Sequence, residues 1–212
     1  MTNAYLNEFE KLNTTTESIY DLGDFNVLII LNDGTNLTDW NDVKNKEDII
    51  YISEDLTNHS SLKEKYKGLK SLKAIVTSDL PDKITELNSM FYGCSSLVDV
   101  EGLGSWDTQD VTNMSGMFAG CSSLVDISCL GSWDTQDVTH MSGMFRGCSS
   151  LVDISCLGSW DTQDVTHMYV MFCGCSSLVD VGGLGSWDTQ NVTNMSDMFL
   201  KCVFVKIYPQ WY

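Results

Sequence analysis

Basic residues are scarce in this chain, and they are almost missing from its second half. The 212 residues carry 12 Lys or Arg against 29 Asp or Glu, which gives a net charge of −17. Between Glu86 and Leu200, Arg146 is the single basic residue among 14 acidic ones. A surface of this sign repels phosphate backbones and anionic lipid headgroups. The sequence therefore predicts a protein that binds neither nucleic acid nor a membrane, and it favours a partner with cationic groups.

Long apolar runs and catalytic motifs are missing as well. No segment approaches the roughly 20 apolar residues that cross a bilayer, and the acidic N-terminus has neither the basic region nor the apolar core of a secretion signal. No nucleophile elbow, phosphate-binding loop or zinc-protease motif occurs. These absences predict a protein that is not an enzyme and uses no cofactor or metal. With 43% hydrophobic residues, the chain still has enough apolar side chains for a substantial core.

The chain contains instead a repeat with a period of 27 residues. Five cysteines mark it at equal spacing: Cys94, Cys121, Cys148, Cys175 and Cys202. Between them the unit reads C-S-S-L-V-D-[VI]-x-x-L-G-S-W-D-T-Q-[DN]-V-T-[NH]-M-x-x-M-F-x-G. A fixed period in the twenties is typical of an α/β solenoid whose coils each contain one short strand and one short helix or tight turn.

Two parts of the unit predict elements that face the core. A short strand is expected where apolar residues recur three apart, as in Leu97, Val100 and Leu103. A short helix, with Thr112 or Asn113 as its N-cap, is expected where residues at i, i+3, i+4 and i+7 are apolar. In the first complete unit, with the cysteine that opens the next, these four residues are Met114, Met117, Phe118 and Cys121.

Weaker copies of the pattern extend toward both ends. The segments 26–31 (NVLIIL) and 48–52 (DIIYI) predict further strands, and residues 3–12 (NAYLNEFEKL) predict a capping helix. After the last cysteine, VFVKIYPQWY predicts one more strand, ended by Pro209. We expect one continuous domain with three parts: an N-terminal cap with irregular repeats over 1–69, regular repeats over 70–202, and a C-terminal capping strand over 203–212.

The repeated phrase W-D-T-x-x-V-T-x-M-x-x-M-F-x-G-C-S-S-L resembles the leucine-rich repeats of BspA-like surface proteins, also described as a domain of unknown function in mycoplasmas. The resemblance covers about residues 70–202. It implies a right-handed leucine-rich-repeat solenoid that acts in adhesion, at the cell surface or outside the cell. Because this sequence contains no recognisable signal or anchor, a cytoplasmic location is the alternative.

Equivalent positions form columns when coils stack, with neighbours about 4.8 Å apart along a strand ladder. Two adjacent columns are the candidate partner-binding site: Val98, Val125, Val152 and Val179, with Asp99, Asp126, Asp153 and Asp180. Stacked carboxylates repel one another, so stability alone does not favour them. Apolar and acidic contacts together suit a protein or cell-surface partner. Two alternatives stay open: the carboxylates hydrogen-bond local backbone, or they bind calcium, although no Asp-x-Asp-x-Asp-Gly loop is present.

The remaining repeated residues are expected to be structural. The tryptophans of W-D-T should close the corner of each coil, and the neighbouring Asp should form a local turn. The cysteines are expected to be buried thiols, although Cys129 and Cys156 occupy one column and are close enough to consider a disulfide. His140 and His167 replace Asn at the start of the expected helix and are not expected to act as bases. The sequence thus predicts a recognition module, with a structural spacer or an intracellular scaffold as the alternative.

Overall fold

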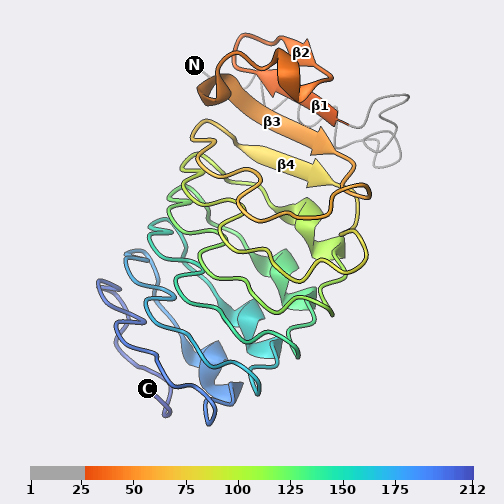
Figure 1. Cartoon of the computed structure of the whole chain (residues 1–212). Helices are drawn as coiled ribbons and strands as arrows, with labels where there is room; N and C mark the ends of the chain where they lie inside the picture. The colour runs from red at the N-terminus through yellow and green to blue at the C-terminus, as the bar shows by residue number, and fades with distance from the viewer. Residues whose placement is uncertain (1–26) are drawn as a thin grey trace.

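A computed structural model describes residues 27–212 as a stack of coils that runs away from a small sheet (Figure 1). The sheet contains β1 (Val27–Leu31), β2 (Asn36–Leu37), β3 (Ile49–Glu54) and β4 (Ala74–Thr77), in the order β2-β1-β3-β4. Strands β1 and β3 are antiparallel, whereas β3 and β4 are parallel. The expected strands at 26–31 and 48–52 are confirmed as β1 and β3. The expected capping helix over 3–12 lies outside the described residues.

Two short 3₁₀ helices connect β2 to β3. They are η1 (Trp40–Asp42) and η2 (Lys46–Asp48), and each begins after a side chain that caps it. The Asp39 carboxylate accepts a hydrogen bond from the backbone N–H of Asn41, and the Asn45 amide oxygen accepts one from Glu47. No described helix is long and apolar enough to cross a membrane.

The coils stack in parallel with an offset of one repeat. Isolated bridges join Glu86 to Asn113, Asn113 to His140, His140 to His167 and His167 to Asn194. Along the Met-Phe segment every second N–H donates to the next coil: that of Met114 to His140 O at 2.9 Å and that of Phe118 to Met144 O at 2.9 Å. The 27-residue period is therefore the length of one coil.

The helix expected over 114–121 is wrong, because this segment is a pair of consecutive turns. The N–H of Met117 bonds Met114 O at 3.2 Å and that of Cys121 bonds Phe118 O at 3.0 Å, while the N–H groups of Phe118 and Gly120 reach the next coil. Gly116 and Gly120 adopt φ of 63° and 79°, which the right-handed helix excludes. The same four side chains are still buried, since two turns place this spacing inward as a helix does.

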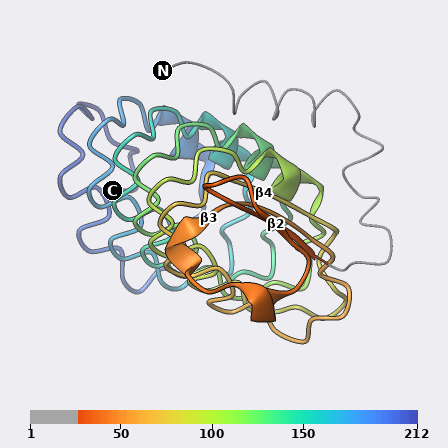
Figure 2. The same cartoon turned by 90° about the horizontal axis from the view of Figure 1, so that it is seen from above.

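The strand expected around 97–103 is also wrong. In the first coil a single bridge joins Asp99 to Ala74, and in the later coils of the described chain no strand forms at the equivalent positions. Each unit forms a five-residue 3₁₀ helix instead: η3 (Glu101–Ser105), η4 (Ser128–Ser132), η5 (Ser155–Ser159) and η6 (Gly182–Ser186). Seen along the stack, these helices lie in a row on one side (Figure 2). Successive helices approach so closely that a Cβ at Gly158 would lie 2.5 Å from Gly183 O, so the absence of a side chain at Gly158 leaves room for the next coil.

The core is a set of columns that run the length of the stack. The rings of Tyr66, Phe91 and Phe118 stack with centroids 5.5 and 5.4 Å apart, and the column continues through Phe145, Phe172 and Phe199. A second column begins with Trp106, Trp133 and Trp160, at 6.0 and 6.4 Å. Each of these indoles is buried and donates its N–H, as Trp133 does to Leu103 O at 2.8 Å. The predicted packing of tryptophan at the corner is confirmed.

The two ends of the stack are closed differently. At the N-terminal end, the buried Glu54 carboxylate accepts hydrogen bonds from Tyr66 Oη at 2.6 Å and Trp40 Nε1 at 3.2 Å, and it pairs with Lys65 Nζ at 2.9 Å. At the C-terminal end no strand occurs within 203–212, so the expected capping strand is wrong. Trp211 stacks on Trp187 at 6.0 Å instead. Aromatic side chains therefore cover the last coil in place of the expected strand.

Candidate functional site

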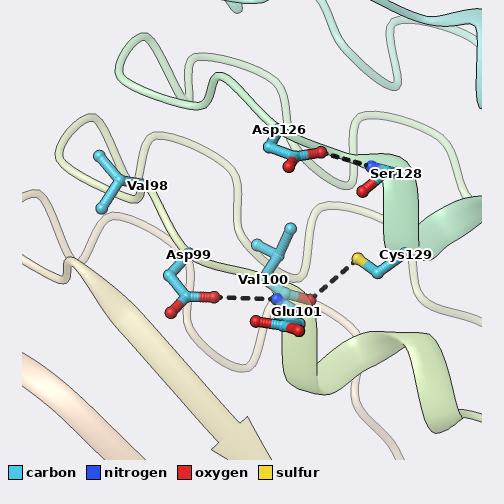
Figure 3. A pocket seen from close by; sticks show the side chains of 7 residues that line it. All are labelled: Val98, Asp99, Val100, Glu101, Asp126, Ser128 and Cys129. Carbon is cyan, nitrogen blue, oxygen red and sulfur yellow. Dashed lines mark hydrogen bonds between the residues drawn. The ribbon is translucent and has the colours of Figure 1, made fainter. Parts of the chain in front are cut away.

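The predicted valine and aspartate columns lie side by side on the surface of the stack. We call them the Val–Asp strip: Val98, Val125, Val152 and Val179, with Asp99, Asp126, Asp153 and Asp180. Two hollows lie along it, of about 500 and 380 Å³. The first is lined by Val98, Asp99 and Asp126, among others (Figure 3), and the second by Val125, Val152 and Asp153. The structure thus brings the predicted residues together, although on irregular backbone rather than on strands.

The valines of the strip are exposed although they are apolar. Their exposed fractions run from 45% for Val152 to 56% for Val179. The neighbouring apolar residues of the same segment, such as Leu124 and Ile127, are fully buried. Single exposed apolar residues are normal on proteins, whereas an aligned row of them marks a surface that another molecule can cover.

Each aspartate of the strip accepts a hydrogen bond from the first N–H of the 3₁₀ helix that follows it. The Oδ1 atoms of Asp99, Asp126, Asp153 and Asp180 accept a hydrogen bond from the backbone N–H two residues later, at 3.0, 2.8, 2.8 and 2.7 Å. Figure 3 shows the first two of these bonds, to Glu101 and Ser128. The expected alternative that the carboxylates bond local backbone is therefore confirmed, and it leaves the second oxygen of each carboxylate for other contacts.

At Asp126 and Asp153 these hydrogen bonds favour the ionised carboxylate more than the neighbouring charges oppose it. The N–H of Ser128 holds the pKa of Asp126 below its ordinary value, and the N–H of Ser155 does the same for the pKa of Asp153. The charge of Asp126 raises the pKa of Asp153, but it is the smallest influence on that group. Because hydrogen bonding to the charged form favours ionisation, both side chains remain carboxylates at neutral pH.

Two cysteines form the floor of the hollows. Cys129 and Cys156 are half-buried free thiols, and their Sγ atoms donate to Val100 O at 3.3 Å and Ile127 O at 3.4 Å. Burial raises the pKa of Cys129 to about 12 and that of Cys156 to about 11. Both side chains are therefore neutral thiols and unreactive as nucleophiles at neutral pH. The disulfide that the sequence left open is not formed.

The other columns serve the architecture. The Oδ1 atoms of Asp107 and Asp134 accept from the N–H groups of Gln109 and Gln136 at 3.2 and 3.1 Å, which confirms the local turn expected at W-D-T. The five cysteines at the repeat spacing are buried; for example, Cys121 Sγ donates to Phe91 O at 3.2 Å. Residues 27–212 contain no cluster of three or more His, Cys, Asp or Glu side chains that could hold a metal ion.

Sequence reasoning missed the part of the site that lies between the coils. Ser128, Cys129, Ser155 and Cys156 line the hollows because the 3₁₀ helices carry them there. The sequence does contain a signal for these helices. Each strip aspartate stands two residues before a small or polar residue, with a glycine close by. In this pattern the short aspartate side chain accepts a hydrogen bond from the backbone of a turn. The stacked rings of His140 and His167 had no signal other than their shared position in the repeat.

The fold and the strip define a class of protein: a non-globular stack of sequence repeats that presents one row of equivalent side chains per column. Within this class, the chain belongs to the family described as "Mycoplasma protein of unknown function, DUF285", whose model matches residues 60–155 and 124–211. This confirms the resemblance at the level of the family.

Among solved structures, the chain is similar to a leucine-rich repeat protein from Bacteroides ovatus ATCC 8483, with 15% identity and a TM-score of 0.42. The similarity covers 90% of this chain and 54% of that protein, so the chain spans about half of its length. No curated protein matches the chain.

Proposed function

We propose that this chain is a non-catalytic recognition module, which binds a protein or cell-surface partner through the Val–Asp strip of a leucine-rich-repeat solenoid. The observation that carries the proposal is the row of four exposed valines, aligned beside four carboxylates and two hollows. A structural spacer, whose repeats serve only to hold other parts at a distance, does not need aligned apolar side chains in contact with water. The repeat family supports a module of this kind.

The chemistry of the strip selects the class of partner. The valines offer apolar area, and the second oxygen of each aspartate offers a negative charge once per coil. A segment that carries Lys or Arg between apolar residues matches both columns, because complementary charge directs binding while apolar contact supplies affinity. A module of this type acts at the cell surface or outside the cell, where such partners are displayed.

The test is a selection of peptides against the whole chain from a random display library. Selected peptides should be enriched in Lys or Arg and apolar residues. Two double variants test the two columns separately. The first, Val125→Thr with Val152→Thr, keeps the shape of the side chains and removes apolar area. The second, Asp126→Asn with Asp153→Asn, removes the charge, while the amide oxygen can still accept the first N–H of the 3₁₀ helix. Each pair should weaken binding of the selected peptides by about tenfold, equivalent to about 1.4 kcal/mol.

The matched control replaces Gln136 and Gln163, exposed side chains of another column, by Ala. This variant should bind the selected peptides as the parent chain does. A selection without basic and apolar enrichment, or peptides that bind both strip variants as tightly as the parent chain, would contradict the proposal and favour a structural spacer or scaffold.

A further inference from the structure

His140 and His167 occupy the same position in consecutive coils, and their side chains lie face to face. Their backbones are joined by a parallel bridge. The two imidazole rings are stacked, with centroids 4.8 Å apart and planes within 7° of each other. His140 is exposed and His167 half-buried, so solvent reaches the pair. The pair lies outside the Val–Asp strip and has no part in the function proposed above.

The hydrogen bonds around the rings determine which nitrogen carries the proton. Thr139 Oγ1 lies 3.2 Å from Thr112 O, to which it donates its only proton, and 2.8 Å from Nδ1 of His140. With that proton on Thr112 O, the Thr139 hydroxyl accepts from Nδ1–H, and we assign this tautomer to His140. The second coil repeats the arrangement, with Thr166 Oγ1 at 3.0 Å from Thr139 O and 2.8 Å from Nδ1 of His167.

This tautomer leaves the two Nε2 atoms as bare acceptors on adjacent coils. Neither has a hydrogen-bond partner among residues 27–212. A neutral imidazole whose other nitrogen donates to a fixed acceptor is the form in which histidine binds metals, and the fixed acceptor orients the ring. Each threonine supplies that acceptor here.

We propose that Nε2 of His140 and Nε2 of His167 together bind one divalent transition-metal ion, of the Ni²⁺, Cu²⁺ and Zn²⁺ class, with water completing its coordination. Imidazole nitrogens select this class, whereas Ca²⁺ and Mg²⁺ require oxygen ligands. Metal–nitrogen distances of about 2.0–2.1 Å require the two Nε2 atoms to lie within about 4.2 Å of each other. Because the stacked rings are nearly parallel, their Nε2 lone pairs point the same way, and sharing one ion requires both rings to turn about their terminal side-chain torsions until the lone pairs converge. These torsions are soft.

The repeat itself supplies conservative variants for the test. Asn113 and Asn194 occupy the same column in the flanking coils, so His140→Asn and His167→Asn place in each coil a residue that the fold already accommodates. Asn113→His extends the pair to three adjacent histidines. Cys173→Ser removes one of the half-buried thiols, which could bind soft metals, and it leaves the histidine pair intact.

The experiment titrates the untagged chain with Ni²⁺ and with Zn²⁺, by calorimetry and by NMR of the imidazole signals. Cu²⁺ is avoided because it oxidises thiols. We expect one ion per chain, with shifts confined to His140 and His167. Loss of a residue that only hydrogen-bonds a metal ligand lowers metal affinity by about 10–100-fold. Loss of a ligand itself should cost at least as much, so each single Asn variant should bind the ion at least about tenfold more weakly. The double variant should show no binding. Asn113→His should bind more tightly, and Cys173→Ser should match the parent.

Two results would overturn the proposal. One is a parent chain that gives neither heat nor histidine shifts with millimolar Ni²⁺ or Zn²⁺. The other is a double Asn variant that binds as the parent does, which would assign the ion to thiols or to His59. A circular dichroism spectrum equal to that of the parent confirms that each variant is folded.

Discussion

Val170 is the residue whose backbone conformation fits its side chain least. It adopts a φ of 51° in the first turn of its coil, a conformation that a β-branched side chain disfavours strongly. The equivalent positions in two other coils are Gly116 and Gly143, with φ of 63° and 62°. The stack imposes the left-handed conformation here because the N–H of this residue must reach the next coil, where it bonds Ser196 O at 2.9 Å.

Val170→Gly should therefore stabilise the protein. The substitution relieves about 1–2 kcal/mol of left-handed strain and loses a part of this to the greater freedom of glycine in the unfolded chain, so we expect a net gain of about 1 kcal/mol in the free energy of unfolding by urea. Gly143→Val is the matched reverse change and should destabilise by a similar amount. A Val170→Gly variant with a lower unfolding free energy would show that packing of the valine against its neighbours outweighs the strain.

At the scale of elements, the burial pattern could be predicted from the sequence, whereas the type of element could not. Met114, Met117 and Phe118 are all fully buried, as the repeated spacing requires. The spacing i, i+3, i+4 and i+7 cannot distinguish a helix from two consecutive turns, because both bring these side chains to one face. Two glycines within the seven residues from 114 to 120 argued against a helix interior, and their left-handed φ explains the outcome.

The candidate site could be predicted for a related reason. The alignment of Val125 and Asp126 with their copies follows from the period alone. Hydrogen bonding of the carboxylates to local backbone was one of the predicted alternatives, whereas the 3₁₀ helix that provides the N–H groups and the hollows beside it could not be predicted, since a strand was expected there. Likewise, no repeat pattern indicates the contacts of Glu54, because it lies in the irregular N-terminal region.

The contacts of Glu54 join strand β3 to the first coil. Its carboxylate is 4% exposed and pairs with Lys65, whose side chain is 14% exposed. His59 Nε2 lies 3.3 Å from the same oxygen. Burial, with the neighbouring carboxylate second, raises the pKa of Tyr66 well above its ordinary value, so the phenol stays a donor to Glu54. A buried charge with this many partners is costly to leave unpaired.

Glu54→Gln should destabilise the protein by about 3–5 kcal/mol, because it leaves the Lys65 ammonium buried without its counter-charge. Addition of Lys65→Met should recover much of that loss. The measurement is urea unfolding followed by circular dichroism. The control is Glu64→Gln, which breaks the exposed pair with Lys67 (2.8 Å, side chains 47% and 42% exposed) and should change stability by less than about 1 kcal/mol. Equal effects of the two Gln variants would mean that the Glu54 charge is not needed.

At the scale of the whole molecule, the stack has a direction. The N–H groups of Met168 and Phe172 donate to carbonyls of the last coil, Asn194 O and Met198 O, at 2.9 Å each. The equivalent N–H groups of the last coil, those of 195, 197, 199 and 201, meet no backbone acceptor within the described chain. The C-terminal end therefore presents a row of free donors, which the short segment after Cys202 covers with Val205, Pro209 and its aromatic residues.

Hydrogen exchange should reveal this direction as a gradient. Amides of the internal coil over 141–147 should open with nearly the global free energy of unfolding, whereas those at 195, 197, 199 and 201 should open at almost no cost. Trp211→Ala, which removes the ring stacked on Trp187, should extend rapid exchange to the amides at 168–174. Val203→Ala, at a side chain that is 69% exposed, should leave the gradient unchanged. Uniform protection along the stack would show that the coils unfold as one unit.

The equivalence of neighbouring coils has a consequence for how such a protein varies over generations. Every described regular coil between Cys94 and Cys202 contacts its neighbours through the same columns. Recombination between near-identical stretches of a gene adds or removes a whole 27-residue unit. Such an event leaves each remaining coil with a neighbour of the kind it had before, whereas the loss of a few residues would shift every column. The unit of inherited change is therefore the coil, and each added coil lengthens the Val–Asp strip by one pair.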